Sequence, residues 1–276
     1  MIKIKPVFYA VLATLPLLPA LAKAETNPYD FLDKTMIESD KNKPTKKVDE
    51  WETTIGLGFG YGSIYQGAAK QEFYFLPVIE ASYGNWGIGF SGINYSFINT
   101  DEWQVGAGIG YDFGRKDKYL PKRYRGLGDV DGGLTTNIFA NYQALDWLGF
   151  SLDVTKSQAD SKSLLVTAGT RADFPLYGES LMGNIGLNAV WANDDHMQSY
   201  YGVNAAQSAK TRLKRFNAKS GLEKLDFSTG ITYLIDKKWT YTAAVGVEAY
   251  QGDAKDSPVI EDKTQPYFFN TISYTF

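Results

Sequence analysis

The feature that most constrains this chain is a two-residue period in its side chains. Over residues 51–62 the odd positions are mostly apolar or aromatic, whereas the even positions are glycine or polar. The same split returns over 104–113, 148–155 and 241–250. A strand places successive side chains on opposite faces, so this pattern predicts strands with one apolar row each. Abundant tyrosine (19 residues) and glycine (27 residues) also favour strands and tight turns over helices.

Eleven strands are predicted from this pattern. Short polar links join several of them into hairpins, and long links remain at 114–132, 193–221 and 251–265. The predicted strand 86–97 loses its phase near Gly92, which indicates a β-bulge. The strands are expected at 51–62, 72–83, 86–97, 103–113, 133–143, 147–156, 163–174, 182–192, 222–235, 239–250 and 266–276.

Residues 1–24 are expected to be a secretory signal peptide. Lysines precede an apolar stretch from 7 to 21, and residues 22–24 (Ala-Lys-Ala) have the small-x-small pattern of a cleavage site. The apolar stretch is too short to span a bilayer, and no later one approaches the ~18 apolar residues that a transmembrane helix needs. Residues 25–50 are polar, mixed in charge and without a period, which predicts a flexible periplasmic segment.

An exported all-β chain can be a soluble sandwich or a membrane barrel, and two features favour the barrel. Aromatic residues such as Trp51, Tyr83 and Trp239 lie near the ends of the apolar rows, as in the aromatic girdles of outer-membrane barrels. The chain also ends on a strand whose aromatic end, Phe276, resembles the strand by which such barrels engage the barrel-assembly machinery. Only closure satisfies every backbone group in lipid. We therefore predict an all-β fold, an antiparallel transmembrane β-barrel of the bacterial outer membrane over 51–276.

The number of strands is the weak point of this prediction. With both termini in the periplasm a bacterial barrel needs an even count, and the pattern indicates eleven. Either one strand is missed, within 193–221 or near Tyr83 to Trp86, or one is false. We expect about twelve strands, with ten as the alternative.

The links between the strands carry an ordered series of short motifs. In chain order they are Phe113-Gly114-Arg115, Arg125-Gly126-Leu127-Gly128, the stretch 191–203, Gln207-Ser208-Ala209, the stretch 252–258 and Tyr274-Thr275-Phe276. This series resembles the MipA/OmpV family of outer-membrane proteins, and the similarity runs from about Trp51 to Phe276. Two places depart from the family pattern: the link 63–67 lacks an expected proline, and the stretch 210–215 is unusually basic.

The resemblance implies an outer-membrane barrel without established catalysis. MipA-type members are described as scaffolds that join a murein lytic transglycosylase to a bifunctional penicillin-binding protein. OmpV-like members are treated as porins, adhesins and surface antigens. We therefore expect a scaffold for peptidoglycan-remodelling enzymes, with a small-solute porin or a surface adhesin as the alternative.

A scaffold needs loops with aromatic and polar anchors, and one long link offers them. The competing interpretation is that the aspartates form a turn while the tyrosines cap the mouth of the barrel. The basic stretch 210–215 is expected to meet either lipopolysaccharide phosphates or protein. The candidate partner-binding residues are Trp191, Asp194, Asp195, His196, Tyr200 and Tyr201.

A channel would use the inward rows of the strands, where carboxylates outnumber cations. In a water-filled lumen this excess would favour cations. The alternative is that the carboxylates are hydrogen-bonded within a filled interior, as in many small barrels. The candidate lumen residues are Glu52, Glu80, Asp112, Asp153, Arg171, Asp173 and Glu248, with Asp226 in the same rows.

Composition argues against other classes of function. The chain has no cysteine and one histidine, so a thiolate or multi-histidine metal site is excluded, and we expect no cofactor or metal. His196 lies among acidic residues in a link, but such a histidine is more often a polar turn residue than a catalyst. Removal of residues 1–24, which hold three lysines and no acid, changes the net charge from −3 to −6. Nucleic acid is therefore not expected as a partner.

Overall fold

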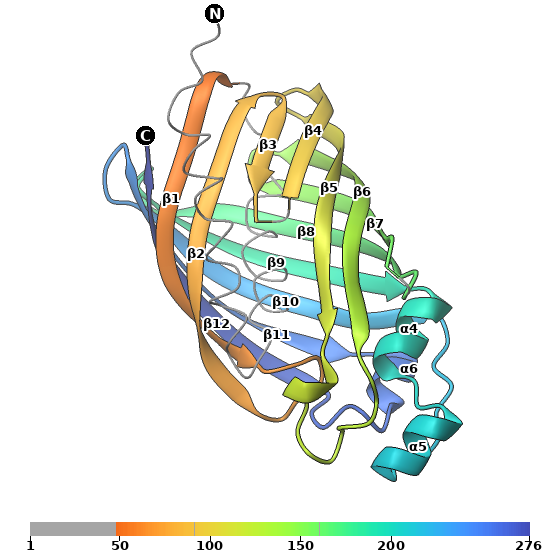
Figure 1. The fold of residues 1–276 in the computed structure, drawn as a ribbon. Helices are drawn as coiled ribbons and strands as arrows, with labels where there is room; N and C mark the ends of the chain where they lie inside the picture. Colours follow the sequence, from red (N-terminus) through yellow and green to blue (C-terminus); the bar gives the residue numbers. More distant parts are fainter. Residues whose placement is uncertain (1–47, 91, 160) are drawn as a thin grey trace, which may run out of the picture.

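The computed structural model describes residues 48–90, 92–159 and 161–276. They form a closed barrel of twelve antiparallel strands, in which the last strand pairs with the first (Figure 1). The predicted all-β barrel and the expected number of twelve strands are both confirmed. The strands are β1 (Val48–Ser63), β2 (Gln71–Gly84), β3 (Trp86–Gly89), β4 (Gly92–Asn99), β5 (Trp103–Arg115), β6 (Val130–Leu145), β7 (Leu148–Ser157), β8 (Leu164–Tyr177), β9 (Leu181–Ala192), β10 (Gly221–Leu234), β11 (Trp239–Tyr250) and β12 (Thr264–Thr275).

The expected signal peptide, residues 1–24, lies outside the described residues. The same holds for residues 25–47 of the predicted polar segment. The barrel begins a few residues before the predicted start at Trp51, because β1 includes Val48.

One predicted strand, 86–97, is in fact a hairpin of two strands, β3 and β4, and this hairpin supplies the missing twelfth strand. Gly89 pairs with Gly92 at its tip. Gly92 has a φ of +119° and lies against the backbone carbonyl of Ile109, where a side chain would clash. The loss of phase near Gly92 therefore marks a turn, and the predicted bulge was wrong. The link 193–221, the other proposed place for a missing strand, holds helices.

The two faces of the wall follow the predicted alternation. In β1 the outward Leu57 and Phe59 are exposed on the outer surface, whereas the inward Gly58 and Gly60 are buried. Outward apolar rows of this kind suit contact with lipid, and closure of the sheet pairs the backbone groups that lipid cannot satisfy. The protein is a multi-pass β-barrel of the bacterial outer membrane.

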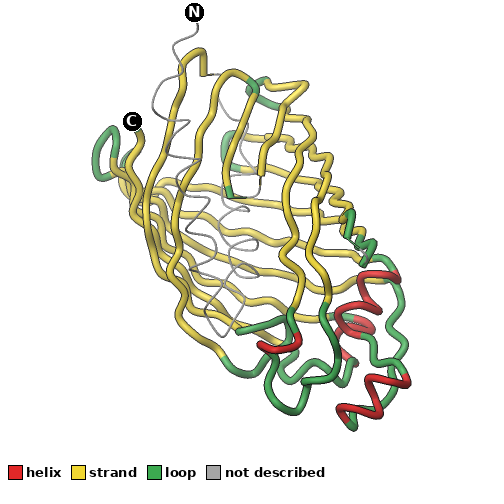
Figure 2. Tube along the Cα trace, viewed as in Figure 1, coloured by secondary structure: helices red, strands yellow, loops and turns green. Residues whose placement is uncertain are grey.

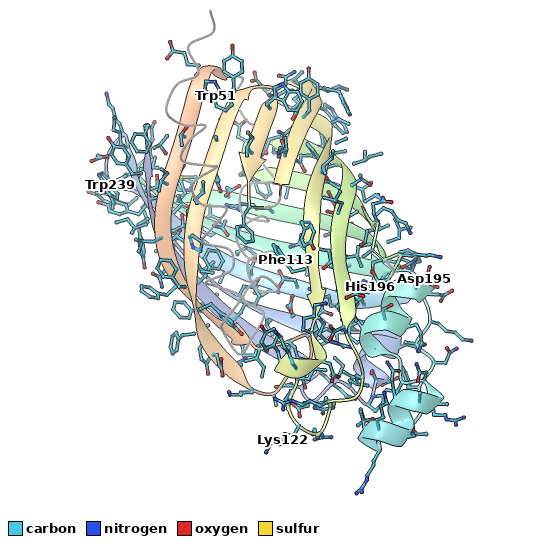
Figure 3. All side chains as sticks on the ribbon, viewed as in Figure 1. Trp51, Phe113, Lys122, Asp195, His196 and Trp239 are labelled. Carbon is cyan, nitrogen blue, oxygen red and sulfur yellow. The ribbon has the colours of Figure 1, made fainter. Side chains whose placement is uncertain are left out.

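Aromatic pairs form a belt at the end of the barrel where β1 begins and β12 ends. Trp51 stacks on Tyr83 with ring centroids 5.3 Å apart, and Trp103 stacks on Tyr142 at 4.4 Å. Figure 3 labels Trp51 and Trp239 at this end. Such rings lie at the level of the lipid headgroups, because they combine an apolar body with a polar atom.

The two ends of the barrel differ in the length of their connections. The end where β1 begins and β12 ends has only short turns among the described residues. The links between β1 and β2, β5 and β6, β9 and β10, and β11 and β12 all lie at the opposite end (Figure 1). Short turns face the periplasm and long loops face outward. The backbone N–H of Phe276 donates to the carbonyl of Thr53 at 2.9 Å, so the C-terminal residue helps to close the barrel at its periplasmic end.

Candidate functional site

The long links at the outer end fold together into a compact structure, which we call the cap. Figure 2 shows its helices, in red, gathered at the end away from the termini. No helix in the described part of the chain is long and apolar enough to cross a bilayer. The helices are the 3-10 turn η2 (Asp117–Tyr119) and the α-helices α4 (Asp194–Tyr201), α5 (Ala205–Thr211) and α6 (Gly252–Asp256).

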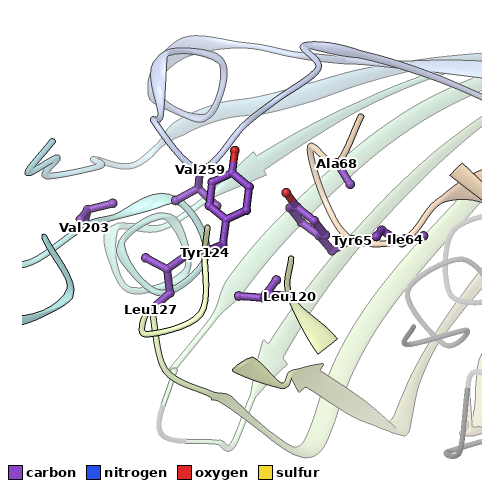
Figure 4. Close-up of a cluster of buried hydrophobic side chains, with 8 residues drawn as sticks. All are labelled: Ile64, Tyr65, Ala68, Leu120, Tyr124, Leu127, Val203 and Val259. Carbon is purple, nitrogen blue, oxygen red and sulfur yellow. The ribbon is translucent and has the colours of Figure 1, made fainter. Parts of the chain in front are cut away.

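A hydrophobic cluster drawn in Figure 4 joins four of these links. Tyr65 and Tyr124 meet edge to face, with ring centroids 6.0 Å apart. Burial raises the pKa of Tyr124 to about 12 and raises the pKa of Tyr65 as well, with the carboxylate of Glu261 as the second cause in both cases. The cluster consists of Ile64, Tyr65, Ala68, Leu120, Tyr124, Leu127, Val203 and Val259.

A second cluster lies under α4 and fixes that helix to the barrel rim. It combines Met197, Tyr200 and Tyr201 of α4 with Tyr250 at the end of β11 and Ala254 of α6, among others. Met197, Tyr201 and Ala254 are completely buried. Because apolar burial is the main driving force for packing, these two clusters make the cap a small folded core of its own.

The start of α4 is determined by local hydrogen bonds. The side-chain oxygen of Asn193 accepts from the backbone N–H of His196 at 3.1 Å, which is a standard N-terminal cap. The same oxygen accepts from the N–H of Leu164 at 3.0 Å, so it also ties the helix to the start of β8. Asp194 and Asp195 lie in the first turn, where negative charge is favourable.

A buried polar centre lies beneath α4. The hydroxyl of Tyr201 donates to Oε1 of Glu223 at 2.6 Å, and Nε2 of His196 lies 3.4 Å from Oε2 of the same carboxylate. Nδ1 of His196 is 3.1 Å from Oγ of Ser163, and its ring stacks on Tyr200 at 4.5 Å. Burial, followed by the charge of Glu223, raises the pKa of Tyr201 well above its ordinary value.

Arg115, at the end of β5, connects the barrel wall to the cap. It is buried, and its Nη1 donates to the backbone carbonyl of Tyr200 at 2.8 Å. Its guanidinium also lies 5.8 Å from the centre of the Tyr200 ring. The last carbonyls of a helix lack donors within the helix, and Arg115 supplies a donor to one of them.

The six candidate partner-binding residues do not form one exposed surface. His196, Tyr200 and Tyr201 are buried in the cap, as the capping interpretation of the tyrosines requires. Asp194 and Asp195 are exposed, and Asp194 accepts the backbone N–H of Ser220 at 2.5 Å. Trp191 lies in the outward row of β9 and is exposed. A partner at the outer surface can therefore reach the two aspartates and Trp191 without opening the cap.

The candidate lumen residues fall into two groups. Glu52, Glu80, Asp112 and Asp153 line an open cavity, and Nδ2 of Asn137 donates to Asp153 at 2.7 Å.

The other candidates are buried in close polar contacts at the opposite side of the lumen. Arg171 pairs with Asp173 at 3.0 Å, and Tyr267 donates to Asp226 at 3.0 Å. Glu248 pairs with Lys224 at 2.6 Å. The lumen is therefore hollow toward β2 and β5, whereas close polar pairs gather at β8, β10 and β11, where Lys224 also lines the cavity.

Two important inward residues, Glu223 and Lys224, were missed by the sequence pattern. The register of β10 against β9 shifts between Leu222 and Lys224, so two successive side chains turn inward instead of one. Both are buried. A strict two-residue period assigns one of any two neighbours to the lipid face, although adjacent charges in an otherwise apolar row were an available signal.

The cavity has a volume of about 470 Å³. It extends from the turn after β2, at Asn85, along the inner side of the wall to Gln66, His196 and Tyr200 of the cap. The cap residues thus form its outer boundary. The arrangement combines a polar lumen with a folded outer lid.

Several solved outer-membrane barrels are similar to the chain at low identity. The KdgM porin has 10% identity and a TM-score of 0.43, over 81% of this chain and 99% of that one. The NanC porin has 9% identity and a TM-score of 0.40, over 82% and 99%. The channel DcaP of Acinetobacter baumannii has 7% identity and a TM-score of 0.36, over 82% and 96%. Such values say nothing about what this barrel binds.

The family comparison is more informative. No curated protein sequence matches the chain at a significant level. The sequence model described as MltA-interacting protein MipA matches residues 55–276, which is nearly the whole barrel with its cap. The resemblance inferred from the link motifs is thereby confirmed, and the chain belongs to the MipA family.

Proposed function

We propose that this barrel is a non-enzymatic scaffold that holds a murein lytic transglycosylase, together with a penicillin-binding protein, on the periplasmic side of the outer membrane. The observation that carries the proposal is the cap, because two hydrophobic clusters and a buried polar centre close the outer end. A barrel closed in this way is suited to anchoring rather than to free diffusion. The family description, which names an interaction with MltA, supports the same role.

The environment of His196 supports a structural role over catalysis. Its ring is buried against Tyr200, and its two nitrogens face Ser163 and Glu223. These contacts fix the ring beneath α4, at the point where His196 also lines the cavity. The histidine therefore serves to hold α4 on the barrel.

We place the partner contact at the periplasmic end, because murein and its enzymes lie in the periplasm and the link 191–209 lies at the outer end. The periplasmic turns carry exposed carboxylates at Asp101, Glu102, Asp146 and Glu179. β1 begins at this same end, and the polar segment 25–50 leads into it in the sequence. Acidic turns and a polar segment suit a partner with a basic surface, which they would attract at long range.

Co-purification from outer membranes tests the scaffold. We expect the intact protein to retain the lytic transglycosylase, and a variant lacking residues 25–47 or carrying Asp101→Lys and Glu102→Lys to lose it. The matched control is Lys210→Ser with Lys214→Ser, which changes exposed charges at the outer end only. If the intact barrel retains no transglycosylase, or if the control loses it as completely, the proposed scaffold or its placement is wrong.

The hollow side of the lumen favours a second candidate, a cation-preferring pathway for small solutes. Glu80, Asp112 and Asp153 line the cavity and would attract cations. Planar-bilayer recording of the refolded mature protein, with Phe276 retained, separates the two candidates. We expect no discrete conductance while the cap is intact. Reproducible steps with cation selectivity would place the channel ahead of the scaffold, and anion selectivity would contradict the assignment of the lumen.

The basic run in the cap suggests which membrane component the outer end contacts. Lys210, Arg212, Lys214 and Arg215 are exposed, while Leu213 between them packs against the first cluster and holds the run in place. We propose that these cations contact lipopolysaccharide phosphates, because guanidinium and ammonium groups are strong phosphate partners. An adhesin or antigen would present this same outer surface. Replacement of the four cations by serine should reduce the lipopolysaccharide that co-purifies.

A further inference from the structure

The barrel wall is incomplete on one side in its outer half. β3 has four residues and β4 has eight, although their neighbours β2 and β5 have 14 and 13. β2 pairs with β3 only over Ala81–Tyr83, and β5 pairs with β4 only over Gln104–Ile109. Toward the cap, β2 and β5 therefore face each other with no strand between them among the described residues. We call this place the gap, and Figure 1 shows β3 and β4 ending partway along their neighbours.

Two phenylalanines lie at the gap. Phe90 is at the tip of the hairpin of β3 and β4, and Phe113 belongs to β5. Both pack against the inward-facing Tyr74 and Leu76 of β2 and Phe269 of β12 as partly buried members of that cluster. Figure 3 labels Phe113 between β2 and β5. Rings rather than backbone hydrogen bonds thus fill this part of the wall, and rings can change rotamer far more easily than a strand can separate.

The cavity of about 470 Å³ reaches the gap from inside. Its lining includes Val78 and Asp112, which face the lumen, but also Pro77, Ile79 and Tyr111, which belong to the outward rows. The strand lengths define the interruption of the wall, since the lining also includes the outward Leu152 of β7, which is paired on both sides. Val78 of β2 and Asp112 of β5 bring the cavity to the inner side of the gap. The interrupted wall and the adjoining cavity together make the gap a lateral connection between the outer surface of the barrel and its lumen.

The chemistry of the connection changes from apolar to polar along its length. On the outer surface the side chains beside the gap are apolar, with Phe73 73% exposed and Ile109 58% exposed. On the inner side Glu80 of β2 and Asp112 of β5 line the cavity from its two edges. Such a passage suits a molecule with an alkyl chain outside and a polar head inside. The carboxylates favour a cationic or hydroxyl-bearing head over a phosphate or sulfate, because like charges repel.

A strand from another chain is a poorer occupant of the gap. Pro77 lies within the part of β2 that borders it. Proline has no N–H to donate, so it interrupts the ladder that an added strand would form and is typical of a protected edge.

We propose that the gap between β2 and β5 is a lateral binding site for a single-chain amphipathic molecule from the outer leaflet. Its cationic or hydroxyl-bearing head enters the cavity beside Glu80 and Asp112, and its alkyl chain lies along Phe73 on the lipid side. Phe90 and Phe113 close the site when it is empty. This function goes beyond the scaffold and is independent of it, because the scaffold uses the periplasmic end.

Photo-crosslinking of the full mature protein in phosphatidylcholine nanodiscs tests this site. The probe is dodecylamine with a diazirine in its chain, and labelled peptides are mapped by mass spectrometry. We expect labelling to concentrate on 71–79 and 107–113, and to be competed by dodecyltrimethylammonium but not by dodecyl sulfate. Glu80→Gln with Asp112→Asn should weaken that competition about fivefold, which is ~1 kcal/mol at 1.4 kcal/mol per tenfold.

The variant Phe113→Ala should accelerate labelling, because it removes one of the rings that fill the gap. The matched control is Phe150→Ala, which removes an exposed phenylalanine of β7 away from the gap. Variants that remain heat-modifiable are folded. If Phe113→Ala does not fold, the map of labelled peptides and the competition experiment with the unaltered protein still test the proposed site. Labelling spread evenly around the barrel, equal competition by dodecyl sulfate, or crosslinks between two copies through β2 would each overturn the proposal.

Discussion

Removing one hydroxyl group from the cap should loosen it measurably. Tyr201 is completely buried and donates to the carboxylate of Glu223, which is itself 2% exposed. In Tyr201→Phe the buried carboxylate loses this donor. A hydrogen bond to a charged group contributes about 1.5–3 kcal/mol, so we expect the cap to lose about 2 kcal/mol. The barrel wall should stay closed, because no strand pairing involves the hydroxyl.

Hydrogen–deuterium exchange measured by mass spectrometry reports this local stability. Where exchange occurs through opening of the cap, about 2 kcal/mol corresponds to a roughly thirtyfold faster exchange of peptides covering α4. Tyr233→Phe is the matched control, because it removes the same group from an exposed tyrosine on the outward face of β10. A double-mutant cycle with Glu223→Gln isolates the pair. If Tyr201→Phe accelerates exchange no more than the control does, the buried polar centre does not hold the cap.

Three further predictions address pH, the lumen and the hairpin. The pKa of Tyr124 is raised to about 12, so the folded cap retains a phenol proton that the unfolded chain loses near pH 10. The cap should therefore be stable below pH 10 and should open as the pH rises toward 12. Tyrosinate absorbance and faster hydrogen–deuterium exchange of the cap would report this opening. Lys224→Met removes the ammonium from the buried Glu248 and should cost about 3 kcal/mol in urea unfolding from detergent micelles, whereas adding Glu248→Gln should restore most of the loss. Gly92→Val should displace the hairpin of β3 and β4 and lower the free energy of unfolding by about 2 kcal/mol. The control Gly128→Ala, where an added methyl group meets nothing, should cost about 1 kcal/mol. Equal losses would show that contact with β5 is unimportant.

Much of the wall was predictable because lipid on one side and a polar lumen on the other impose a two-residue period on each strand. This period located ten strands one by one and assigned Glu80, Asp112 and Asp153 to the lumen. It failed where the backbone departs from a regular strand. Gly92 turns the chain within a few residues, and the shift at Leu222 brings Glu223 and Lys224 inward together. A local pattern cannot distinguish a tight turn from a bulge, because both simply reverse its phase.

The sequence by itself determined the fold class, the lipid-facing row of most strands and the family, and it required an even number of strands without deciding between ten and twelve. Only the tertiary structure decided what the links do. Tyr65 and Tyr124 are 59 positions apart in the chain, and their contact depends on how the barrel places its loops around one rim. The cap and the gap arise from the lengths of β3 and β4 and from packing between links. These are properties of the closed barrel, so residues near in sequence do not encode them.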